Sequence, residues 1–521
     1  MGGFFTEPRG ALPYAGCMSK ARGGAGSDLH WREIELKLAI VARDLASLRR
    51  RLARLGAGTT AELDNVYFDT AGHLLRGNRM ALRVRRIGRR WVQTLKTETA
   101  SRALSQRGEW EVPAPRGRLD LGRFPPTPLA SLLQAHPDAR LLPVFRTGFR
   151  RTIWVADNGA IEVALDEGEI VAGERREPIL ELELELKSGA ADALYRLALE
   201  LSGKGRQAPA LRPAVESKAA RGYRLAAGEI VVPAKANARA VVGEPRPDAT
   251  LAAALRGVVE RGTTLLLANA VGVAGGADPE FVHQARVAVR RMRSSARLLG
   301  SSTGWPVGID DDLRWIARRL GTARDWDVLQ TQTLPALAEA LPEAAKRLSE
   351  PVLALRGRND AQLASALASP RFARLALRLL RWSNVPADES GPTLTSAAQR
   401  RLARLHRRLF ESAAFFVALP VEEQHRVRIR AKRLRYALDL FAVALPAKPT
   451  ARYVEKLADL QDQLGALNDA VVAASLVPRA SRGAGVDAAP VLAWLEQQRR
   501  QHALLAEGAL AELSRLPVPW R

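Results

Sequence analysis

Charged and apolar residues alternate along several short stretches in the first half of the chain. Residues 181–187 place leucines between four charged positions, Glu181, Glu183, Glu185 and Lys187. Successive side chains of a β-strand point to opposite faces, so this spacing gathers the charges of one strand on one face. The same pattern recurs in three other stretches, at Glu33, Glu35, Lys37, Arg83, Arg85, Glu109 and Glu111.

A solvated face of a half-buried sheet would explain any one of these strands. It does not explain why several strands carry same-face charges of both signs. A closed barrel with a polar interior accounts for the pattern, because acidic strands can hold cations while basic strands hold phosphate oxygens. Converging carboxylates without His or Cys suit Mg²⁺ or Mn²⁺, which prefer oxygen ligands.

Seven motifs along this part of the chain resemble those of CYTH domains, the triphosphate tunnel metalloenzymes. The first of them contains the ExExK signature, and the series covers residues 31–225. In chain order the motifs are EIELKL (33–38), YFDT (67–70), LRVRR (82–86), QTLKT (93–97), RGEWE (107–111), LELELK (182–187) and SKAARGYRL (217–225). The resemblance implies an eight-stranded antiparallel β tunnel that takes up a triphosphate and cleaves it with a divalent metal.

The same resemblance implies roles for individual side chains. The expected metal ligands are Glu33, Glu35, Glu183 and Glu185, with Asp166 and Glu181 as further candidates. The side chains expected to bind the substrate's phosphate oxygens are Lys37, Arg83, Arg85, Lys96, Arg107, Arg150 and Lys187, with Lys218 at the tunnel end. The residues expected to be catalytic are Glu33, Glu35, Lys37 and Lys187.

The chemistry of triphosphate hydrolysis fits these residue types. A linear triphosphate carries about four to five negative charges, so binding it requires several cations at fixed positions. In-line hydrolysis then needs orientation, charge neutralisation and an activated water. We expect one Mg²⁺ or Mn²⁺ ion to bridge phosphate oxygens and a second, held by carboxylates, to activate water. Thiamine triphosphatases and class IV adenylate cyclases of the family share the phosphate-binding residues, so organic triphosphates remain alternative substrates.

A basic helical segment occurs twice in the second half of the chain. HQARVAVRRMR (283–293) and HRVRIRAKRLR (425–435) align without a gap. Each has a His and three basic residues at relative positions 0, 3, 7 and 10, a spacing that lies on one stripe of a helix. A second pair, LGTARDWDV (320–328) and LGALNDAVV (464–472), places Asp325 opposite Asp469. The two pairs of segments are separated by nearly the same number of residues in both copies, which indicates a duplication.

One Arg-rich stripe could be a solvated surface, but like charges on one stripe repel by a few tenths of a kcal/mol per pair. A bound anion would offset that repulsion in both copies, whereas the two aspartates are expected to be structural. The segments resemble the CHAD domain over residues 249–515. That resemblance implies two pseudo-symmetric four-helix bundles whose stripes bind inorganic polyphosphate through His283, Arg286, Arg290, Arg291, Arg293, His425, Arg428, Lys432, Arg433 and Arg435.

The change of hydrophobic period divides the chain. We predict a disordered lead-in over residues 1–30, a CYTH domain over 31–225, a linker over 226–248 and a CHAD domain over 249–515. The fold class is therefore an α+β domain on an eight-stranded antiparallel tunnel, followed by an all-α domain.

The charge balance points to anionic partners. The chain has 79 Lys and Arg against 55 Asp and Glu, and residues 1–240 and 241–521 each carry a net charge of +12. Cys17 is the only cysteine, which excludes an internal disulfide. No apolar run is long enough for a membrane span, and no secretory signal is recognisable, so the expected compartment is the cytoplasm.

These observations together predict an inorganic triphosphatase tethered to polyphosphate, and to polyphosphate granules, by its helical domain. The alternatives are an organic triphosphate hydrolase or cyclase, and a non-catalytic polyphosphate-binding protein. Nucleic acid is the less favoured polyanion, because the stripes lack aromatic residues for base stacking and no known reading motif is present.

Overall fold

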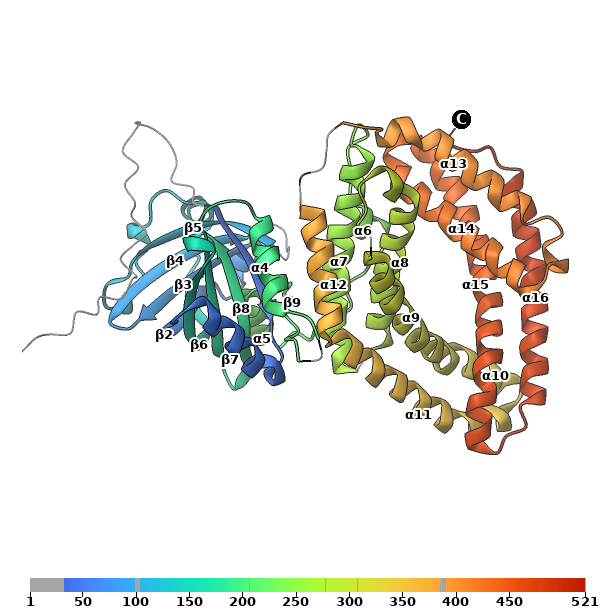
Figure 1. Ribbon diagram of the computed structural model, residues 1–521, viewed down its shortest axis with the longest axis horizontal. Coiled ribbons are helices and arrows are strands. Elements are labelled where there is room, and N and C mark those ends of the chain that lie inside the picture. The colour runs from blue at the N-terminus through green and yellow to red at the C-terminus, as the bar shows by residue number, and fades with distance from the viewer. Residues whose placement is uncertain are drawn as a thin grey trace, which may run out of the picture.

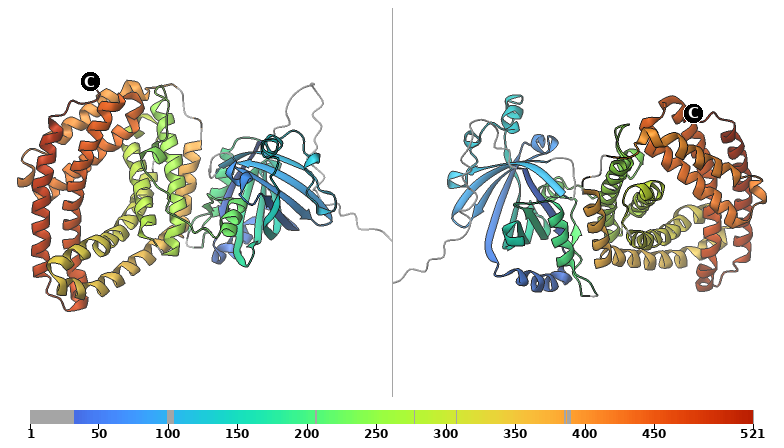
Figure 2. Two further views of the ribbon diagram at one scale, coloured as in Figure 1. Left: turned by 180° about the vertical axis from the view of Figure 1, so that it is seen from behind. Right: turned by 45° about the horizontal axis from the view of Figure 1, so that its top comes forward.

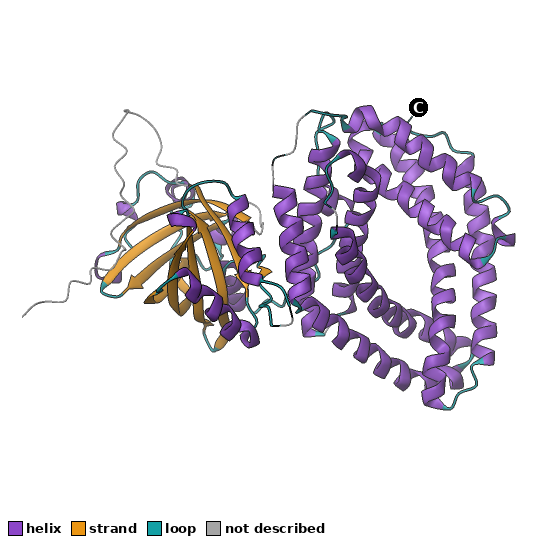
Figure 3. Cartoon of the chain, in the orientation of Figure 1, coloured by secondary structure: helices purple, strands orange, loops and turns teal. Residues whose placement is uncertain are grey.

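The computed structural model describes residues 32–98, 104–205, 207–276, 278–306, 308–384, 386 and 390–520. The strands lie in the first part of the chain, and the long helices in the second part are arranged in a ring (Figure 1, Figure 3). This arrangement confirms the predicted fold class, an α+β domain followed by an all-α domain.

The sheet of the first part is antiparallel, and its strand order is β5-β4-β3-β2-β6-β7-β8-β1-β9. Eight strands are long, as predicted, and β9 has two residues. Within the described residues the strands are β1 (Arg32–Ala39), β2 (Thr59–Asp69), β3 (Met80–Ile87), β4 (Arg90–Glu98), β5 (Leu104–Pro113), β6 (Leu142–Ala156), β7 (Ile161–Ala172), β8 (Arg175–Leu186) and β9 (Arg212–Pro213).

Strand β1 joins the two ends of the long-stranded sheet. One edge of β1 pairs with β8, while the other edge pairs with β5 over Arg32–Leu36 and with β9 over Leu38–Ala39. The eight long strands therefore follow one another in a ring of backbone pairings. Figure 2 shows these strands from two further directions. In this ring β3 is the fourth strand from β8, and β4 is the fourth strand from β7. The basic strands β3 and β4 therefore stand on the wall opposite β7 and β8.

The alternation of residue types decides which face of the sheet is inside. The leucines of β1 and β8, among them Leu36, Leu38, Leu182 and Leu184, are fully buried in a core that includes α1 (Leu45–Leu52) and α4 (Asp192–Ser202). The charged residues between those leucines must then face the barrel interior. Smaller connections carry α2 (Leu74–Gly77) and α3 (Pro128–Gln134).

Helix α5 (Lys218–Ala227) packs against β6, β7 and β8. Its N-terminus is capped by the Ser217 hydroxyl, which accepts a hydrogen bond from the Ala220 amide, and it ends at Gly228 with φ of 66°. The cap sets the start of the helix so that Lys218 is its first residue.

The helical domain contains two sets of four helical segments in the same order. The first set is α7 (Leu251–Gly275), α8 (Pro279–Leu299), α9 (Ile309–Val328) with α10 (Leu334–Ala340), and α11 (Pro342–Leu367). The second set is α13 (Leu394–Glu411), α14 (Val421–Phe441), α15 (Ala447–Ala484) and α16 (Ala489–Ser514). The N-caps of α7 and α13, Thr250 and Thr393, pair with each other in an isolated bridge. The duplication in the sequence is thus a duplication of structure.

An additional helix, α12 (Pro370–Asn384), packs against α4 and β9 of the barrel domain. Arg381 makes a two-bond ion pair with Asp192, at 2.7 and 3.0 Å, and Arg374 donates to the carbonyls of Leu199 and Gly203 at 2.9 and 2.7 Å. The predicted linker contains α6 (Ala238–Val242), and the Asn269 side chain on α7 binds both backbone groups of Ala234. The two domains are therefore docked through specific polar contacts.

Candidate functional site: a two-walled tunnel and a basic helical cluster

One wall of the tunnel is acidic and is built by β1, β7 and β8. The strand register places Lys37 opposite Glu183, and the ammonium lies 2.7 Å from the Glu183 carboxylate. The same ammonium lies 2.9 Å from Glu35, whose side chain is only 3% exposed. Lys37 therefore bridges carboxylates of two neighbouring strands.

A second cation enters this wall from α5. The Lys218 ammonium lies 2.7 Å from Asp166 and 3.0 Å from Glu183, and it also contacts Glu181. Arg151 on β6 forms two hydrogen bonds to Asp166, at 2.7 and 2.6 Å, and one to Glu183. Three buried carboxylates are thus held together by two cations from different elements.

These cations keep Glu183 ionised. Burial alone would raise the pKa of Glu183, but Lys218, Lys37 and Arg151 outweigh burial and hold that pKa well below its usual range. Burial likewise opposes the charge of Lys218, yet Asp166, Glu181 and Glu183 raise its pKa above the ordinary value. Glu183 and Lys218 consequently stay charged across the physiological range of pH.

The opposite wall is basic and is built by β3 and β4. Lys96 lies 3.0 Å from Glu109, while Arg83 lies 3.9 Å from the same carboxylate. Arg85 donates a 2.7 Å hydrogen bond to the neutral amide oxygen of Asn65. Burial, with further contributions from Arg83 and Arg151, lowers the pKa of Arg85 to about 10. An anion between the two walls would relieve this like-charge repulsion.

The remaining residues expected to act in the tunnel either lie nearer to solvent or have side chains that the structure does not describe. Lys187 is 39% exposed and pairs with Glu185 at 2.6 Å. The backbones of Glu33 and Arg107 belong to the paired strands β1 and β5, but their side chains lie outside the described part of the structure.

The acidic wall has a donor set that fits a hard divalent cation. Oxygen atoms of Asp166, Glu181 and Glu183 lie within 4.8 Å of one another. Carboxylate oxygens without sulfur or imidazole are the ligands preferred by Mg²⁺ and Mn²⁺. Lys218 already contacts all three residues, so an ion bound among them would displace its ammonium group.

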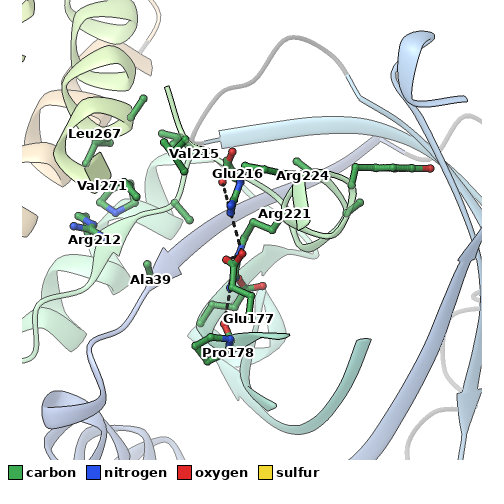
Figure 4. Close-up of a pocket in the computed structure, with 18 of the residues that line it drawn as sticks. Ala39, Glu177, Pro178, Arg212, Val215, Glu216, Arg221, Arg224, Leu267 and Val271 are labelled. Carbon is green, nitrogen blue, oxygen red and sulfur yellow. Dashed lines mark hydrogen bonds and ion pairs between the residues drawn. The ribbon is translucent and has the colours of Figure 1, made fainter. Parts of the chain in front are cut away.

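A further cavity lies outside this tunnel, between α5, β9 and α7. Its volume is about 950 Å³, and its lining includes Arg212, Arg221 and Val271 (Figure 4). Arg221 and Arg224 both pair with Glu177 there, at 2.6 and 3.0 Å. The cavity shares Glu181 with the acidic wall.

The helical domain brings part of each basic stripe into one cluster. Lys432 on α14 interacts with Arg428 on the same helix and with Arg290 and Arg286 on α8, and burial with these cations lowers its pKa to about 6. Asp469 on α15 also faces it. Asp325 on α9 interacts with Arg286, Asp469 and Arg428, so the two equivalent aspartates meet in this cluster. We call Arg286, Arg290, Arg428 and Lys432 the central cluster.

Other residues of the stripes surround the central cluster or make separate contacts. Arg291 and Arg435 both pair with Asp439, at 2.7 and 3.3 Å, and the Arg291 guanidinium lies 4.9 Å from the centre of the Tyr436 ring. His425 is hydrogen-bonded to Asn468, while burial and then Arg324 lower the pKa of His283. Arg293 is next to Arg297, and Arg433 lines a separate cavity with α13.

Family comparisons agree with this geometry. A family model of the CYTH domain matches residues 32–223, and one of the CHAD domain matches residues 257–478. An uncharacterised protein of Mycobacterium tuberculosis is 30% identical over 455 residues, covering 78% of this chain and 81% of that protein. The chain belongs to the CYTH–CHAD family.

Two further relatives each cover one domain of this CYTH–CHAD protein. An inorganic triphosphatase of Haemophilus influenzae is 36% identical over 177 residues, covering 32% of this chain and 47% of that enzyme. The chain thus matches about half the length of that relative. The solved CHAD domain of Ricinus communis is 31% identical, with coverage of 55% of this chain and 98% of that chain and a TM-score of 0.48. Within the described residues, no helix is long and apolar enough to cross a membrane.

The CYTH domain also contains a tunnel residue that sequence reasoning missed. Arg150 was the expected phosphate ligand of β6, but its side chain is 49% exposed and lies 3.3 Å from Glu167, on the outer face. Its neighbour Arg151 points inward to Asp166 instead. The register of β6 and β7, which pairs Arg151 with Asp166, determines which of the two arginines faces the tunnel. Two consecutive arginines in the sequence do not by themselves indicate which one points inward.

Proposed function

We propose that the CYTH domain hydrolyses inorganic triphosphate to pyrophosphate and phosphate with Mg²⁺ or Mn²⁺. The observation that carries the proposal is the pair of opposed walls, with Glu35 and Glu183 on one side and Arg83, Arg85 and Lys96 on the other. The similarity to an inorganic triphosphatase supports it.

The basic wall would orient the substrate. Arg83 and Arg85 present guanidinium groups that can bind phosphate oxygens through two parallel hydrogen bonds, and Lys96 adds a point charge. Lys37 would stabilise charge on the phosphoryl group nearest the carboxylates. These cations sit at fixed positions before substrate binds, so little reorganisation is needed when negative charge shifts in the transition state.

The acidic wall would hold the metal. Glu35, Glu183 and Glu185 are its proposed ligands, with Glu33 from the same strand as Glu35, and Asp166 and Glu181 behind them. A divalent ion there supplies charge neutralisation and an activated water. Lys218 and Arg151 hold the deeper carboxylates in position through ion pairs.

For the CHAD domain, we propose binding of inorganic polyphosphate at the central cluster. Its four basic residues, three of them arginines, come from both copies of the repeat, and two carboxylates, Asp325 and Asp469, interact with them. A polyphosphate chain would neutralise this excess. Such binding would place the protein on polyphosphate granules in the cytoplasm, a location that microscopy of the labelled full chain can check.

The test of the enzymatic proposal is phosphate release from tripolyphosphate, thiamine triphosphate and ATP, with Mg²⁺, with Mn²⁺ and with chelator. Glu183→Gln should lower kcat/KM for tripolyphosphate by about 100-fold or more, because it removes a charge that the metal requires. Glu167→Gln is the matched control, since Glu167 is on the adjacent strand but pairs outward with Arg49 at 2.6 Å.

Each outcome of this assay has a defined meaning. Metal-dependent release from tripolyphosphate that is lost in Glu183→Gln but retained in Glu167→Gln supports the proposal. A higher kcat/KM for thiamine triphosphate or ATP would reassign the tunnel to an organic substrate. No release from any of the three would reduce the tunnel to a phosphate-binding module.

A further inference from the structure

The cavity between α5, β9 and α7 has walls from both domains and from the segment that joins them. The CYTH domain contributes residues 39–42 at the end of β1, together with Tyr223 on α5. Helix α7 of the CHAD domain contributes Leu267 and Val271, and the joining segment contributes residues 230–232. The volume of about 950 Å³ lies within the roughly 300–1,000 Å³ typical of small-molecule sites. We call this space the interdomain cavity.

Large apolar side chains of the interdomain cavity are exposed. Ile230 is 81% exposed, Val232 is 67% exposed and Val271 is 42% exposed, and all three line the cavity. Single exposed apolar residues are ordinary on a protein surface, whereas several around one hollow are typical of a binding site. Each Å² of apolar surface removed from water contributes about 25 cal/mol. A ligand with an apolar body would therefore be stabilised here.

One arginine of the lining has no counter-ion. Arg212 on β9 is half-buried, and within the described residues its side chain makes no ion pair and no hydrogen bond. Burial lowers the pKa of Arg212, and no carboxylate of the described residues acts against burial. Figure 4 shows Arg212 at the α7 end of the cavity, with Leu267 and Val271. A guanidinium group thus stands in a largely apolar part of the lining.

The other half-buried arginines of the lining have carboxylate partners. The ion pairs are those of Arg221 and Arg224 with Glu177, at 2.6 and 3.0 Å, and that of Arg76 with Glu229, at 2.7 Å. Arg79 is exposed to solvent. Five arginines and four glutamates line the cavity, so its lining has one net positive charge. A ligand with one negative charge would balance it.

We propose that the interdomain cavity binds an amphiphilic monocarboxylate, with the carboxylate on Arg212 and the apolar body against α7 and residues 230–232. A guanidinium group holds a carboxylate through two parallel hydrogen bonds. A phosphate ester is the poorer match, because it has about 1.5 to 2 negative charges at pH 7 and further oxygens that apolar walls cannot bind. The bound molecule contacts both domains and the joining segment, so it stabilises their docking.

This site is separate from the two sites proposed above. Among the described residues that line the interdomain cavity there is no member of the central cluster and none of Arg83, Arg85 and Lys96. Glu181 is the residue that the cavity shares with the acidic wall. Carboxylate binding can therefore fail while tripolyphosphate hydrolysis and polyphosphate binding succeed, and the reverse also holds.

The experiment is calorimetric titration of the full chain with decanoate and with naphthoate, an aliphatic and an aromatic monocarboxylate, each below the concentration at which it aggregates. At least one of them should bind with one molecule per chain. Arg212→Gln should raise the Kd by about tenfold or more, and Arg212→Lys, which retains the charge, should recover part of the affinity. Arg239→Gln is the matched control, because Arg239 lies in the joining segment outside the cavity and pairs with Glu244 at 2.9 Å.

A second variant tests the cavity without removing a charge. Ala268 lines the cavity from α7, so the indole of Ala268→Trp would occupy the space of the ligand and should also raise the Kd by about tenfold or more. Circular dichroism and thermal melting verify the fold of each variant. If Arg212→Gln does not fold, Ala268→Trp decides, and an unchanged Kd in that variant overturns the inference.

Three further results would overturn the inference. The first is that neither carboxylate binds to the full chain. The second is that the Kd is equal in Arg212→Gln and Arg239→Gln, which would place the ligand elsewhere on this basic protein. The third is that decanol binds as tightly as decanoate, since Arg212 would then not recognise the carboxylate.

Discussion

Lys432 should take up a proton when the CHAD domain binds polyphosphate. Its pKa in the free protein is about 6, because burial and then Arg428, Arg290 and Arg286 disfavour its charge, with Asp469 only partly compensating. At pH 7.5 the side chain is therefore only about 3% protonated. A phosphate chain along the central cluster supplies the negative charge that the ammonium form lacks.

The size of the effect follows from Coulomb's law. A unit negative charge about 4 Å away contributes roughly 4 kcal/mol at an effective dielectric constant of 20, which corresponds to about three pKa units. The pKa of bound Lys432 would then be about 9, and complex formation at pH 7.5 should take up about 0.9 proton. Affinity for polyphosphate should consequently fall about eightfold for each pH unit between about 7 and 8.5.

The assay is calorimetry of polyphosphate binding in two buffers that differ in ionisation enthalpy, at pH 7.5. The control is Lys432→Arg, which stays charged and should remove most of the proton uptake and flatten the pH dependence. The pKa of His283 is lowered below its ordinary value, so titration of that ring lies below this pH window. Equal proton uptake in wild type and Lys432→Arg would refute the reasoning.

The same shift has a consequence for stability. Between pH 6 and about 10.5 the unfolded chain binds a proton at Lys432 that the ligand-free folded protein does not, so stability should rise with pH in this window. Lys432→Met removes the buried amine and should flatten that rise. Thermal melting of both proteins from pH 7 to 9 measures the difference.

Three further predictions concern the tunnel and the domain contact. Arg151→Gln should lower kcat/KM for tripolyphosphate by about 100-fold, whereas Arg150→Gln should stay within about twofold; similar losses in both would place β6 in the wrong register. Lys218→Met should destabilise the protein by about 3 kcal/mol at pH 7, since it leaves buried carboxylates without their cation. That loss should shrink as the pH falls below about 4.5, because cations hold the pKa of Glu183 well below that value and its contribution to stability disappears as pH falls. Replacing Arg374 and Arg381 together with Ala should split one calorimetric unfolding transition into two, and a single unchanged transition would contradict this.

The periodicity of polar and apolar residues along the sequence was sufficient to predict the fold class. Alternation at Glu183 and Glu185 and at Arg83 and Arg85 predicted strands with one charged face, and the helical repeat predicted two equivalent sets of helices. These are local properties, since the direction of a side chain within one strand or helix depends only on the period of that element.

Sequence reasoning was weakest where neighbouring residues have the same chemistry. It selected Arg150 rather than Arg151, and only the pairing of β6 with β7 shows which arginine faces the carboxylates. It treated Arg291 and Arg433 as equivalent, but Arg291 pairs with Asp439 while Arg433 lines a separate cavity with α13. Aligned positions of a repeat acquire different neighbours because the two copies pack against each other and against different helices.

The sequence by itself determined which strands carry charge, that acidic and basic strands share one domain, and that a basic helix is duplicated. Only the tertiary structure decided that the basic strands stand opposite the acidic ones, that Lys218 enters the acidic wall from α5, and that basic residues of α8 and α14 meet in the central cluster. The physical reason is that the periodicity and composition of one strand or helix determine which residues share a face. Strand order and helix packing determine which residues of other elements that face contacts.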